Sequence, residues 1–589
     1  MKRIKTLKIR RYRLKVIYLM GKIYYNTMIY IKKHIYTKKE IFMTRLNKIL
    51  FILGGLSAAA LPVTAIACND TQKPTPTPPT PPAPQPQPQP QTPETASEVV
   101  VREIFTNLLS TTHGRKAGDQ NNFKTDSLNF VDTNNGKGKV SNGLKGVGED
   151  KRAKTSIVEK SLINKFGDSA HPVNPEHSNY GSYYAYQYLK KQIKDMGYEY
   201  HSEEEILYPT YSETASDISL YYYDNELEAQ IISKMKDNLK KDGFFTQGFL
   251  YNLKNSRNNI GNNLVVTINP SSKITNNNTI NVKDFYIVSH YDSTNNVGPK
   301  GTSWGATDNA SGVAVNLALL KHFSKVENRD KLGVRLHLIF VDAEELGKFG
   351  STAFVSQFLY GQANEELLQN SLGMINMDTV AGGDYMYIHS PDTRGAKETD
   401  NTSPLLRDFI NKISKERATE LKDDSQELKI HPQFVEEEFK QGETGDWSDH
   451  APFYQIANLP VAYVESTNFG VKSKNKIYDG YAQTTNPKAW VLKDGKTTLA
   501  DQGKTLLKRT LENGQVVYDW PEGMTDADFA VLGDIWHSDL DTLQWINENI
   551  GRRFYKQLDT VFNTLTRFLE KMYTKTDSGI TYQQFNKTN

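Results

Sequence analysis

The stretch VRLHLIFVDAEELGKFGSTAFVSQFLY, residues 334–360, decides the fold class. Its first half is apolar enough for a buried strand, and two adjacent glutamates, Glu344 and Glu345, follow that strand. The helical pattern STAFVSQFLY then begins at residue 351. A carboxylate at the end of a core strand is costly unless it is paired or binds a metal. The pattern therefore predicts a strand that feeds a helix, with two carboxylates that need a cation.

Strands and helices alternate on both sides of this stretch. We predict strands at 262–269, 284–293, 371–380 and 459–466, and helices at 311–326, at 552–573 and within 182–200, where a glycine ends the helical pattern. Such alternation indicates an α/β domain with a largely parallel sheet. In such sheets ligands gather outside the carboxyl ends of the strands. The Asn-rich segment 273–282 and the stretch 466–530 are typical of loops or insertions.

The overall charge of +3 is unevenly distributed along the 589 residues. Residues 1–42 hold 13 lysines and arginines and one acidic residue, so the remainder carries nine more acidic than basic residues. A basic surface that binds nucleic acid is therefore not expected in the globular part. We expect residues 1–42 to come from an upstream start codon rather than to form a second membrane-associated segment.

Residues 43–67 have the pattern of a secretory signal. Arg45 and Lys48 precede a run of apolar and small residues that ends at Cys68, the only cysteine of the chain. The pattern resembles a bacterial lipoprotein signal, in which the cysteine is lipidated, although Ala65 stands where an aliphatic residue is more usual. We therefore expect a lipid anchor at Cys68, rather than a membrane-spanning helix, and a location on the extracellular face of the cell membrane. One cysteine also excludes an intrachain disulfide.

A proline- and glutamine-rich linker follows Cys68 and extends to residue 96. This composition cannot form a core and is typical of an extended, semi-rigid spacer. The globular domain is expected to run from residue 97 to residue 589, with an insertion at about 466–530. An anchor, a spacer and a domain in this order fit an enzyme held away from a membrane surface.

Imidazole and carboxylate groups recur at the ends of the predicted strands and in loops. The segments SHYDS, WGATDNASG, DAEELGKFGS, INMDTV and IWHSDLDTL supply, in chain order, His290 with Asp292, Asp308, Glu344 with Glu345, Asp378, and His537 with Asp541. Histidine and carboxylate without thiolate suit zinc in a catalytic site. These groups exceed what one zinc needs, and a two-metal site with a bridging carboxylate accounts for the surplus.

The order HxD, GAxDNxSG, EExGxxGS, a strand-end aspartate and a late histidine resembles the M28 family of zinc peptidases. The resemblance covers most of residues 100–575, and its motifs lie at 290–380 and around 537. It implies an α/β/α sandwich with a central, mostly parallel mixed sheet. It also implies two zinc ions per chain and hydrolysis of peptide bonds through a water that bridges the metals.

The resemblance further implies a ligand set. His290 and Asp378 would hold one zinc, and Glu345 and His537 would hold the other. Asp308 would bridge the two ions. The chain between the last two ligands is longer than in compact members of the family, and the expected insertion accounts for its length.

Three more residues would support the reaction. Glu344 would be the general base that takes a proton from the bridging water and passes it to the leaving amine. Asp292 would orient His290, because a metal-binding histidine usually donates its other N–H to a carboxylate. Asp541 is a supporting candidate beside His537. The adjacent glutamates would thus divide the work, since one binds metal and its neighbour stays free.

Four residues outside this set also carry side chains of catalytic type. Asp449 and His450, in GDWSDHAPF, match a family segment near the site and are expected to face the cleft without binding metal. His322 and His337 fall in apolar periodic stretches, and we interpret both as structural.

The sequence favours a zinc-dependent exopeptidase, in particular an aminopeptidase, acting on peptides or proteins outside the cell. HYDS, GATD and WH also resemble glutaminyl-peptide cyclotransferases, which share the fold and use one zinc. Metal count and pyroglutamate formation separate these two functions. A third alternative is a non-catalytic peptide-binding surface lipoprotein, which is disfavoured because every catalytic position is filled.

Overall fold

The computed structural model describes the chain from residue 93 to residue 586, apart from several internal stretches. The residues between these limits that lie outside the described part are 113, 118–129, 133–155, 159–180, 202–206, 210–232, 234, 254–256, 277–280, 295–303, 361–363, 392–403, 433, 435–438, 440–446, 473–480, 577 and 578. The predicted basic segment, the signal, Cys68 and all but the last four residues of the linker also lie outside it. Among the described residues, no helix combines the length and the apolar composition needed to cross a bilayer.

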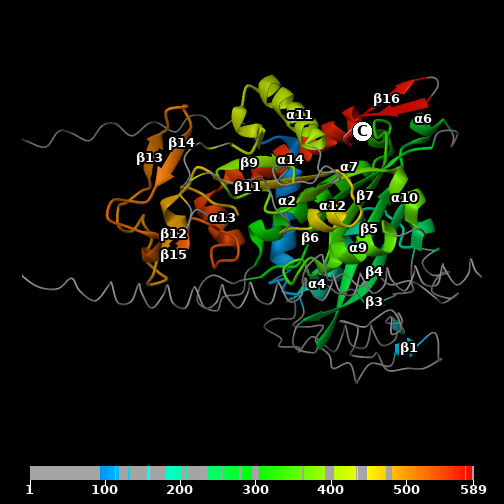
Figure 1. Ribbon diagram of the computed structural model, residues 1–589, viewed down its shortest axis with the longest axis horizontal. Helices are drawn as coiled ribbons and strands as arrows, with labels where there is room; N and C mark the ends of the chain where they lie inside the picture. The colour runs from blue at the N-terminus through cyan, green and yellow to red at the C-terminus, as the bar shows by residue number, and fades with distance from the viewer. Residues whose placement is uncertain are drawn as a thin grey trace, which may run out of the picture. The chain divides into compact units, whose positions relative to one another are not determined.

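A nine-stranded mixed sheet forms the centre of the domain (Figure 1). From one edge to the other its strands are β10 (Leu428–Ile430), β9 (Tyr385–His389), β11 (Val461–Thr467), β8 (Ser371–Met377), β6 (Asp284–His290), β7 (Arg335–Val341), β5 (Arg257–Ile268), β4 (Gly243–Leu253) and β3 (Leu207–Pro209). The strands β11, β8, β6 and β7 run parallel to one another, whereas β9 is antiparallel to β11, and β5 is antiparallel to β7 and β4. The predicted mostly parallel sheet is confirmed.

Alternate residues of the central strands face two separate cores. On one face Phe285 and Ile287 of β6 belong to the larger core, which is completed by α2 (Ala96–Thr111), α4 (Ser182–Asp195), α7 (Ser311–Phe323), α11 (Leu405–Leu421) and α14 (Arg552–Lys571). On the other face Tyr286 and Val288 belong to a second core with α9 (Phe349–Phe358) and α12 (His450–Gln455). Helices on both faces of one sheet make the α/β/α sandwich that the sequence predicted.

The burial of helix α7 on all sides explains its amino-acid composition. It packs against α2, α14 and the sheet, and its residues from 311 to 320 are all buried. A helix buried on all sides must be apolar or small throughout, as SGVAVNLALL is. The packing of α7 holds the N-terminal end of this helix at the carboxyl edge of the sheet. The turn with Asp308 directly precedes that end.

The expected insertion holds short strands with a small core of their own. β12 (Trp490–Leu492) pairs with β15 (Phe529–Leu532), and β13 (Leu507–Thr510) pairs with β14 (Val516–Asp519). Figure 1 shows these strands gathered at one end of the domain. Trp490 is fully buried there, and its indole N–H donates to the Thr484 carbonyl at 3.0 Å. His537 lies shortly after β15 in the chain.

The remaining described elements are short. They are β1 (Phe130–Asp132) with β2 (Ser156–Val158), the C-terminal hairpin β16 (Tyr573–Thr576) with β17 (Gly579–Tyr582), and the helices α6 (Ser272–Thr275), α8 (Val326–Arg329), α10 (Glu365–Asn370) and α13 (Leu543–Asn549).

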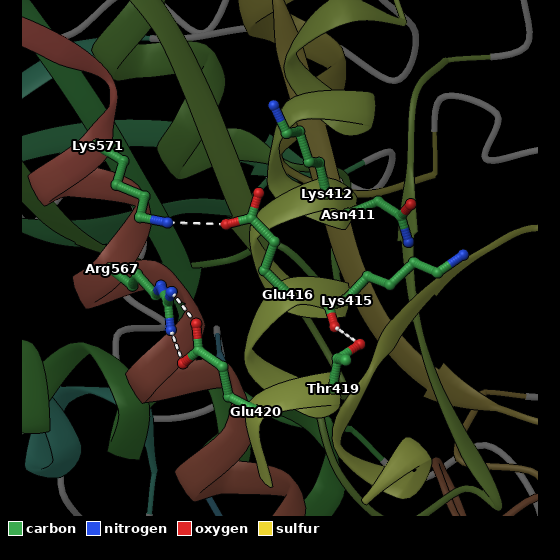
Figure 2. Close-up of a pocket in the computed structure, with 8 residues that line it drawn as sticks. All are labelled: Asn411, Lys412, Lys415, Glu416, Thr419, Glu420, Arg567 and Lys571. Carbon is green, nitrogen blue, oxygen red and sulfur yellow. Dashed lines mark hydrogen bonds and ion pairs between the residues drawn. The ribbon is translucent and has the colours of Figure 1, made fainter. Parts of the chain in front are cut away.

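A groove of about 600 Å³ lies between α11 and α14 (Figure 2). Two ion pairs line it, Arg567 with Glu420 and Lys571 with Glu416. None of the metal-type residues named above lines this groove, so it is separate from the candidate site.

Candidate metal centre

Three neighbouring parallel strands deliver most of the expected ligands to one edge of the sheet. His290 is the last residue of β6, and the register places it opposite Val341, the last residue of β7. Asp378 directly follows β8. Glu344 and Glu345 lie in the turn between β7 and α9. These side chains come together because the carboxyl ends of parallel strands meet at the same edge.

The other two expected ligands come from loops. Asp308 lies in the π-helical turn Ala306–Ala310 that leads into α7. His537 follows β15 and adopts a φ of 52°, a conformation that is uncommon for a residue with a side chain and is found at functional sites. The structure thus gathers all five predicted ligands, which lie up to 247 positions apart in the sequence.

Two sets of ligand atoms share the carboxylate of Asp308. On one side His290 Nε2 lies 3.2 Å from Asp308 Oδ1 and 3.3 Å from Asp378 Oδ1. On the other side His537 Nε2 lies 3.0 Å from Asp308 Oδ2 and 2.8 Å from Glu345 Oε2. Each oxygen of Asp308 therefore faces a different histidine, which is the arrangement that a bridging carboxylate requires.

These side chains fit a bound metal. Two ligand atoms of one tetrahedral zinc, each about 2.0–2.1 Å from the ion, lie about 3.3 Å from each other. Four buried atoms of the cluster make no hydrogen bond within the described part of the chain: His290 Nε2, Asp308 Oδ1, Glu345 Oε1 and Asp378 Oδ1. A buried polar atom without a partner is costly, and cations at this place would satisfy all four.

The electrostatics of the cluster also favour a cation. Burial and the nearby charge of Asp308 together raise the pKa of Glu345 to about 7. Burial alone would lower the pKa of His537, but Glu345 and Asp308 outweigh it and raise that pKa to about 11. The extra proton on His537 thus supplies positive charge to this cluster. A bound divalent metal would supply that charge in place of the proton.

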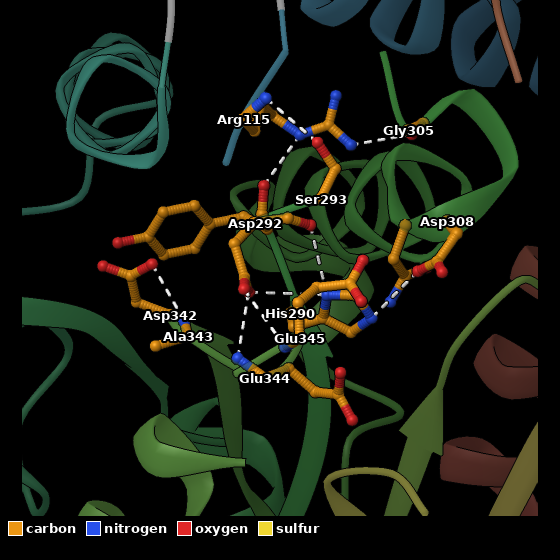
Figure 3. A network of polar contacts seen from close by, with 12 residues as sticks. Arg115, His290, Asp292, Ser293, Gly305, Asp308, Asp342, Ala343, Glu344 and Glu345 are labelled. Atoms are coloured by element: carbon orange, nitrogen blue, oxygen red, sulfur yellow. Dashed lines mark hydrogen bonds and ion pairs between the residues drawn. The ribbon is translucent and has the colours of Figure 1, made fainter. Parts of the chain in front are cut away.

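Asp292 holds three of the expected site residues in place (Figure 3). Its Oδ1 accepts from the backbone N–H of Glu344 at 3.1 Å, and its Oδ2 accepts from that of Glu345 at 3.2 Å. The ring Nδ1 of His290 lies 3.2 Å from the carbonyl oxygen of Asp292 and 3.5 Å from its Oδ1. The predicted partner of His290 therefore also fixes the turn with the two glutamates.

Asp541 makes contacts that differ from those we expected. The sequence placed it beside His537, but its Oδ1 accepts from the backbone N–H and the hydroxyl of Thr307, and its Oδ2 accepts from the N–H of Asp308 at 3.3 Å. Burial raises its pKa to about 7, although these N–H donors oppose the rise. Asp541 therefore supports the loop of the bridging aspartate.

One supporting residue escaped the sequence reasoning. Ser448 donates its hydroxyl to Asp378 Oδ2 at 2.8 Å and accepts from the Asn376 side chain at 2.7 Å. Its neighbour Asp449 is buried and accepts from the Ser351 hydroxyl at 2.5 Å. The sequence reasoning singled out WSDHAPF for Asp449 and His450. Ser448, which directly precedes them, was the signal that could have identified this supporting residue.

The three histidines that the sequence analysis placed outside the ligand set sit among packed side chains. His450 is buried and its ring stacks on Tyr463 at a centroid distance of 5.0 Å. His337 is buried between Thr267 and Asp284. His322 lies edge-on to Phe323 at 4.8 Å. For the last two, packing of this kind accords with the structural role that we expected.

Comparison with known proteins gives the family. The model of peptidase family M28 matches residues 263–559, a range that contains the whole cluster. The chain belongs to peptidase family M28. Membership confirms the resemblance read from the motifs, and it implies zinc as the metal of this centre.

Individual relatives of this M28 protein are distant. A glutamate carboxypeptidase 2 homolog of Caenorhabditis briggsae is 26% identical over 189 residues, which cover 31% of this chain and 23% of that protein. A solved zinc aminopeptidase from Bacillus subtilis gives a TM-score of 0.29 and 18% identity, covering 55% of this chain and 53% of its own. Glutaminyl cyclase from Porphyromonas gingivalis gives a TM-score of 0.32 and 14% identity, covering 66% of this chain and 96% of its own. The chain thus spans 23% of the curated relative and 53% of the aminopeptidase.

Proposed function

We propose that this protein is a zinc-dependent exopeptidase, in particular an aminopeptidase, that hydrolyses terminal peptide bonds of extracellular peptides. The observation that carries the proposal is the Asp308 carboxylate, whose oxygens lie 3.2 Å from His290 Nε2 and 3.0 Å from His537 Nε2. Each histidine has a further carboxylate beside it. Two such sets joined by one carboxylate match a pair of metals that act together in hydrolysis.

Five residues would hold two zinc ions. His290 and Asp378 would bind one ion and Glu345 and His537 the other, while Asp308 would bind both. Bound zinc would supply Lewis-acid activation of the attacking water and of the substrate carbonyl. Asp292, Asp541 and Ser448 keep four of these ligands in place, through hydrogen bonds to His290 and Glu345, to Asp308 and to Asp378.

Glu344 would handle the proton. Figure 3 shows its side chain diverging from that of Glu345, although both backbone N–H groups are held by Asp292. Burial raises the pKa of Glu344 well above its usual value, with a further rise from the charge of Asp449. A carboxylate with a raised pKa is a stronger base, so Glu344 would take a proton from the attacking water and return it to the leaving amine.

The cellular location belongs to the same proposal. The signal pattern at residues 43–67 and the single cysteine at its end support a lipid anchor at Cys68 on the extracellular face of the membrane. Peptides or proteins outside the cell would then be the substrates. Labelling of the full chain with a palmitate analogue should succeed in the parent and fail in the Cys68→Ala variant, and equal labelling of both would exclude this anchor.

The catalytic proposal is tested by metal content and turnover of three proteins. The parent, Glu344→Gln and the control Glu366→Gln, an exposed glutamate of α10, are loaded with zinc and assayed on aminoacyl substrates. We expect two zinc ions per chain in all three and a fall in kcat of about 10²–10⁴-fold in Glu344→Gln alone. Unchanged kcat in Glu344→Gln would remove this residue as the base.

The same samples separate the alternative functions. Blocking the substrate N-terminus with an acetyl group should abolish cleavage by an aminopeptidase, whereas cleavage of the blocked peptide from its other end would indicate a carboxypeptidase. One zinc per chain together with pyroglutamate formation from an N-terminal glutamine would indicate a cyclotransferase. Zinc binding without turnover of any peptide would indicate a binding protein.

A further inference from the structure

Arg115 is a buried cation close to the metal centre. It lies in the short segment that follows α2, and it is 0% exposed. Its backbone N–H donates to Ser293 Oγ at 2.9 Å, and its carbonyl accepts from the Ser293 N–H at 3.1 Å. On the other side of the segment, the Gly114 carbonyl accepts from Gly181 at the start of α4 at 2.7 Å. The segment is therefore fixed to the loop after β6 and to the helical layer.

Each of the three guanidinium nitrogens of Arg115 donates to a backbone carbonyl. Its Nε donates to Tyr291 O at 2.7 Å, Nη1 donates to Trp304 O at 2.6 Å, and Nη2 donates to Gly305 O at 2.7 Å. A methyl group added at Gly305 would lie 2.5 Å from Nη2, so the loop passes directly against the guanidinium. The rigid fork of an arginine can reach three carbonyls at once, which a lysine ammonium on its flexible chain does not reproduce.

The three carbonyls belong to two of the loops that carry expected metal ligands. Tyr291 immediately follows His290, and Gly305 accepts the first hydrogen bond of the turn with Asp308, from Ala310 N–H at 2.9 Å. Figure 3 shows the guanidinium between these loops, on the side away from the turn that holds the two glutamates. One side chain therefore spans the gap that sets the separation of His290 Nε2 and Asp308 Oδ1.

The charge of Arg115 also suits this place. It interacts favourably with Asp541, Asp308, Asp292 and Glu345, and these attractions partly oppose the effect of burial, which lowers its pKa to about 10. The side chain therefore stays protonated at neutral pH. Its positive charge offsets the repulsion among the carboxylates, while its donors stay on carbonyls and leave the ligand oxygens to a metal.

We propose that Arg115 is a positioning residue of the metal centre, whose guanidinium holds two loops so that His290 and Asp308 present their ligand atoms at the separation that zinc requires. This rests on the proposed function only in its need for a metal at the cluster. It makes no use of the substrate or of the direction of cleavage. The role is exerted through the backbone, since Arg115 contacts carbonyls on both loops.

The test compares zinc affinity with stability in two matched variants. Arg115→Lys removes the fork, and the control Arg335→Lys replaces a partly buried arginine, which pairs with Asp284 at the opposite end of the strands. Zinc affinity of the full chain is measured by competition with a chelator, and metal-free stability is measured by denaturant unfolding. We expect Arg115→Lys to bind zinc about tenfold or more weakly. Arg335→Lys should lose stability and keep its zinc affinity within about twofold of the parent.

Turnover and a milder variant complete the test. At saturating zinc, Arg115→Lys should lower kcat per folded, zinc-loaded chain with little change in KM, and this normalisation removes the effect of a smaller folded fraction. If Arg115→Lys does not fold, Ser293→Ala removes one anchor of the segment, and its zinc affinity should fall about three- to tenfold. A folded variant that binds zinc as tightly as the parent overturns the proposal. A parent that binds zinc without hydrolysing peptides would contradict the proposed function, and the affinity comparison would still decide the role of Arg115.

Discussion

Replacing Asp292 by asparagine should lower the zinc affinity of the metal centre. The carboxylate is fully buried, and its two oxygens accept from the backbone N–H groups of Glu344 and Glu345 at 3.1 and 3.2 Å. An asparagine keeps one acceptor and turns an NH₂ group toward the other N–H, so one charge-assisted hydrogen bond worth about 1.5–3 kcal/mol is lost. Since about 1.4 kcal/mol is a factor of ten, zinc affinity should fall about ten- to hundredfold.

The assay for Asp292→Asn is chelator competition for zinc, followed by kcat on an aminoacyl substrate at saturating zinc. The matched control is Asp284→Asn, at the other end of the same strand, where the buried carboxylate accepts from Arg335 and Asn370. The control should lower the free energy of unfolding and leave zinc affinity unchanged. Zinc affinity of Asp292→Asn within about twofold of the parent would refute the reasoning, because it would show that the turn with the two glutamates keeps its position without the carboxylate.

Three further predictions follow from contacts around the centre. Ser448→Ala removes the hydroxyl that donates to Asp378 Oδ2 at 2.8 Å, so zinc binding should weaken about tenfold in the same competition assay, and equal affinity would contradict this. Zinc binding at about pH 7 should release protons and should weaken as the pH falls, because neighbouring carboxylates hold the pKa of His290 well above its usual value and that of His537 at about 11. A zinc titration in weak buffer that releases no acid would argue against this coupling. Burial lowers the pKa of His337, so below about pH 6.5 the unfolded chain takes up a proton that the folded chain does not, and the free energy of unfolding should fall. Denaturant unfolding between about pH 7.5 and about pH 5.5 should show a flatter decline of this free energy in His337→Gln than in the parent.

The central strands could be predicted because their signal is local. β6 and β7 are built around the apolar runs Phe285–Val288 and Leu338–Val341, which are typical of strands buried on both faces. The strand β9 (Tyr385–His389) escaped prediction because it has five residues of mixed polarity, and its pairing with β11 establishes it as a strand. The strand β4 was also missed, because its extended form depends on the long antiparallel pairing with β5.

The site residues also divide into those with a local sequence signal and those that only the fold brings together. The five clustered residues were found because each lies in a short motif, and the order of the motifs was informative even across the insertion. Arg115 could not be found from spacing, because its Nε bonds to a carbonyl 176 positions further along the chain, and any arginine can donate to a carbonyl. The contacts of Asp541 with Thr307 span 234 positions, so only the folded chain shows which loop it supports.

The late position of His537 has a consequence for how the protein matures. Its ring meets Glu345 across 192 positions of sequence, and a contact between such distant residues forms slowly because a long loop must close first. Since zinc that binds only the folded chain stabilises that state, uptake of the metal is coupled to this closing contact. A nascent chain that extends one residue beyond β8 holds His290, Asp308, Glu345 and Asp378, yet it still lacks the last ligand. The proposed peptidase activity would thus arise only after nearly all of the domain has been made, so an incomplete chain would not cut peptides during its own synthesis.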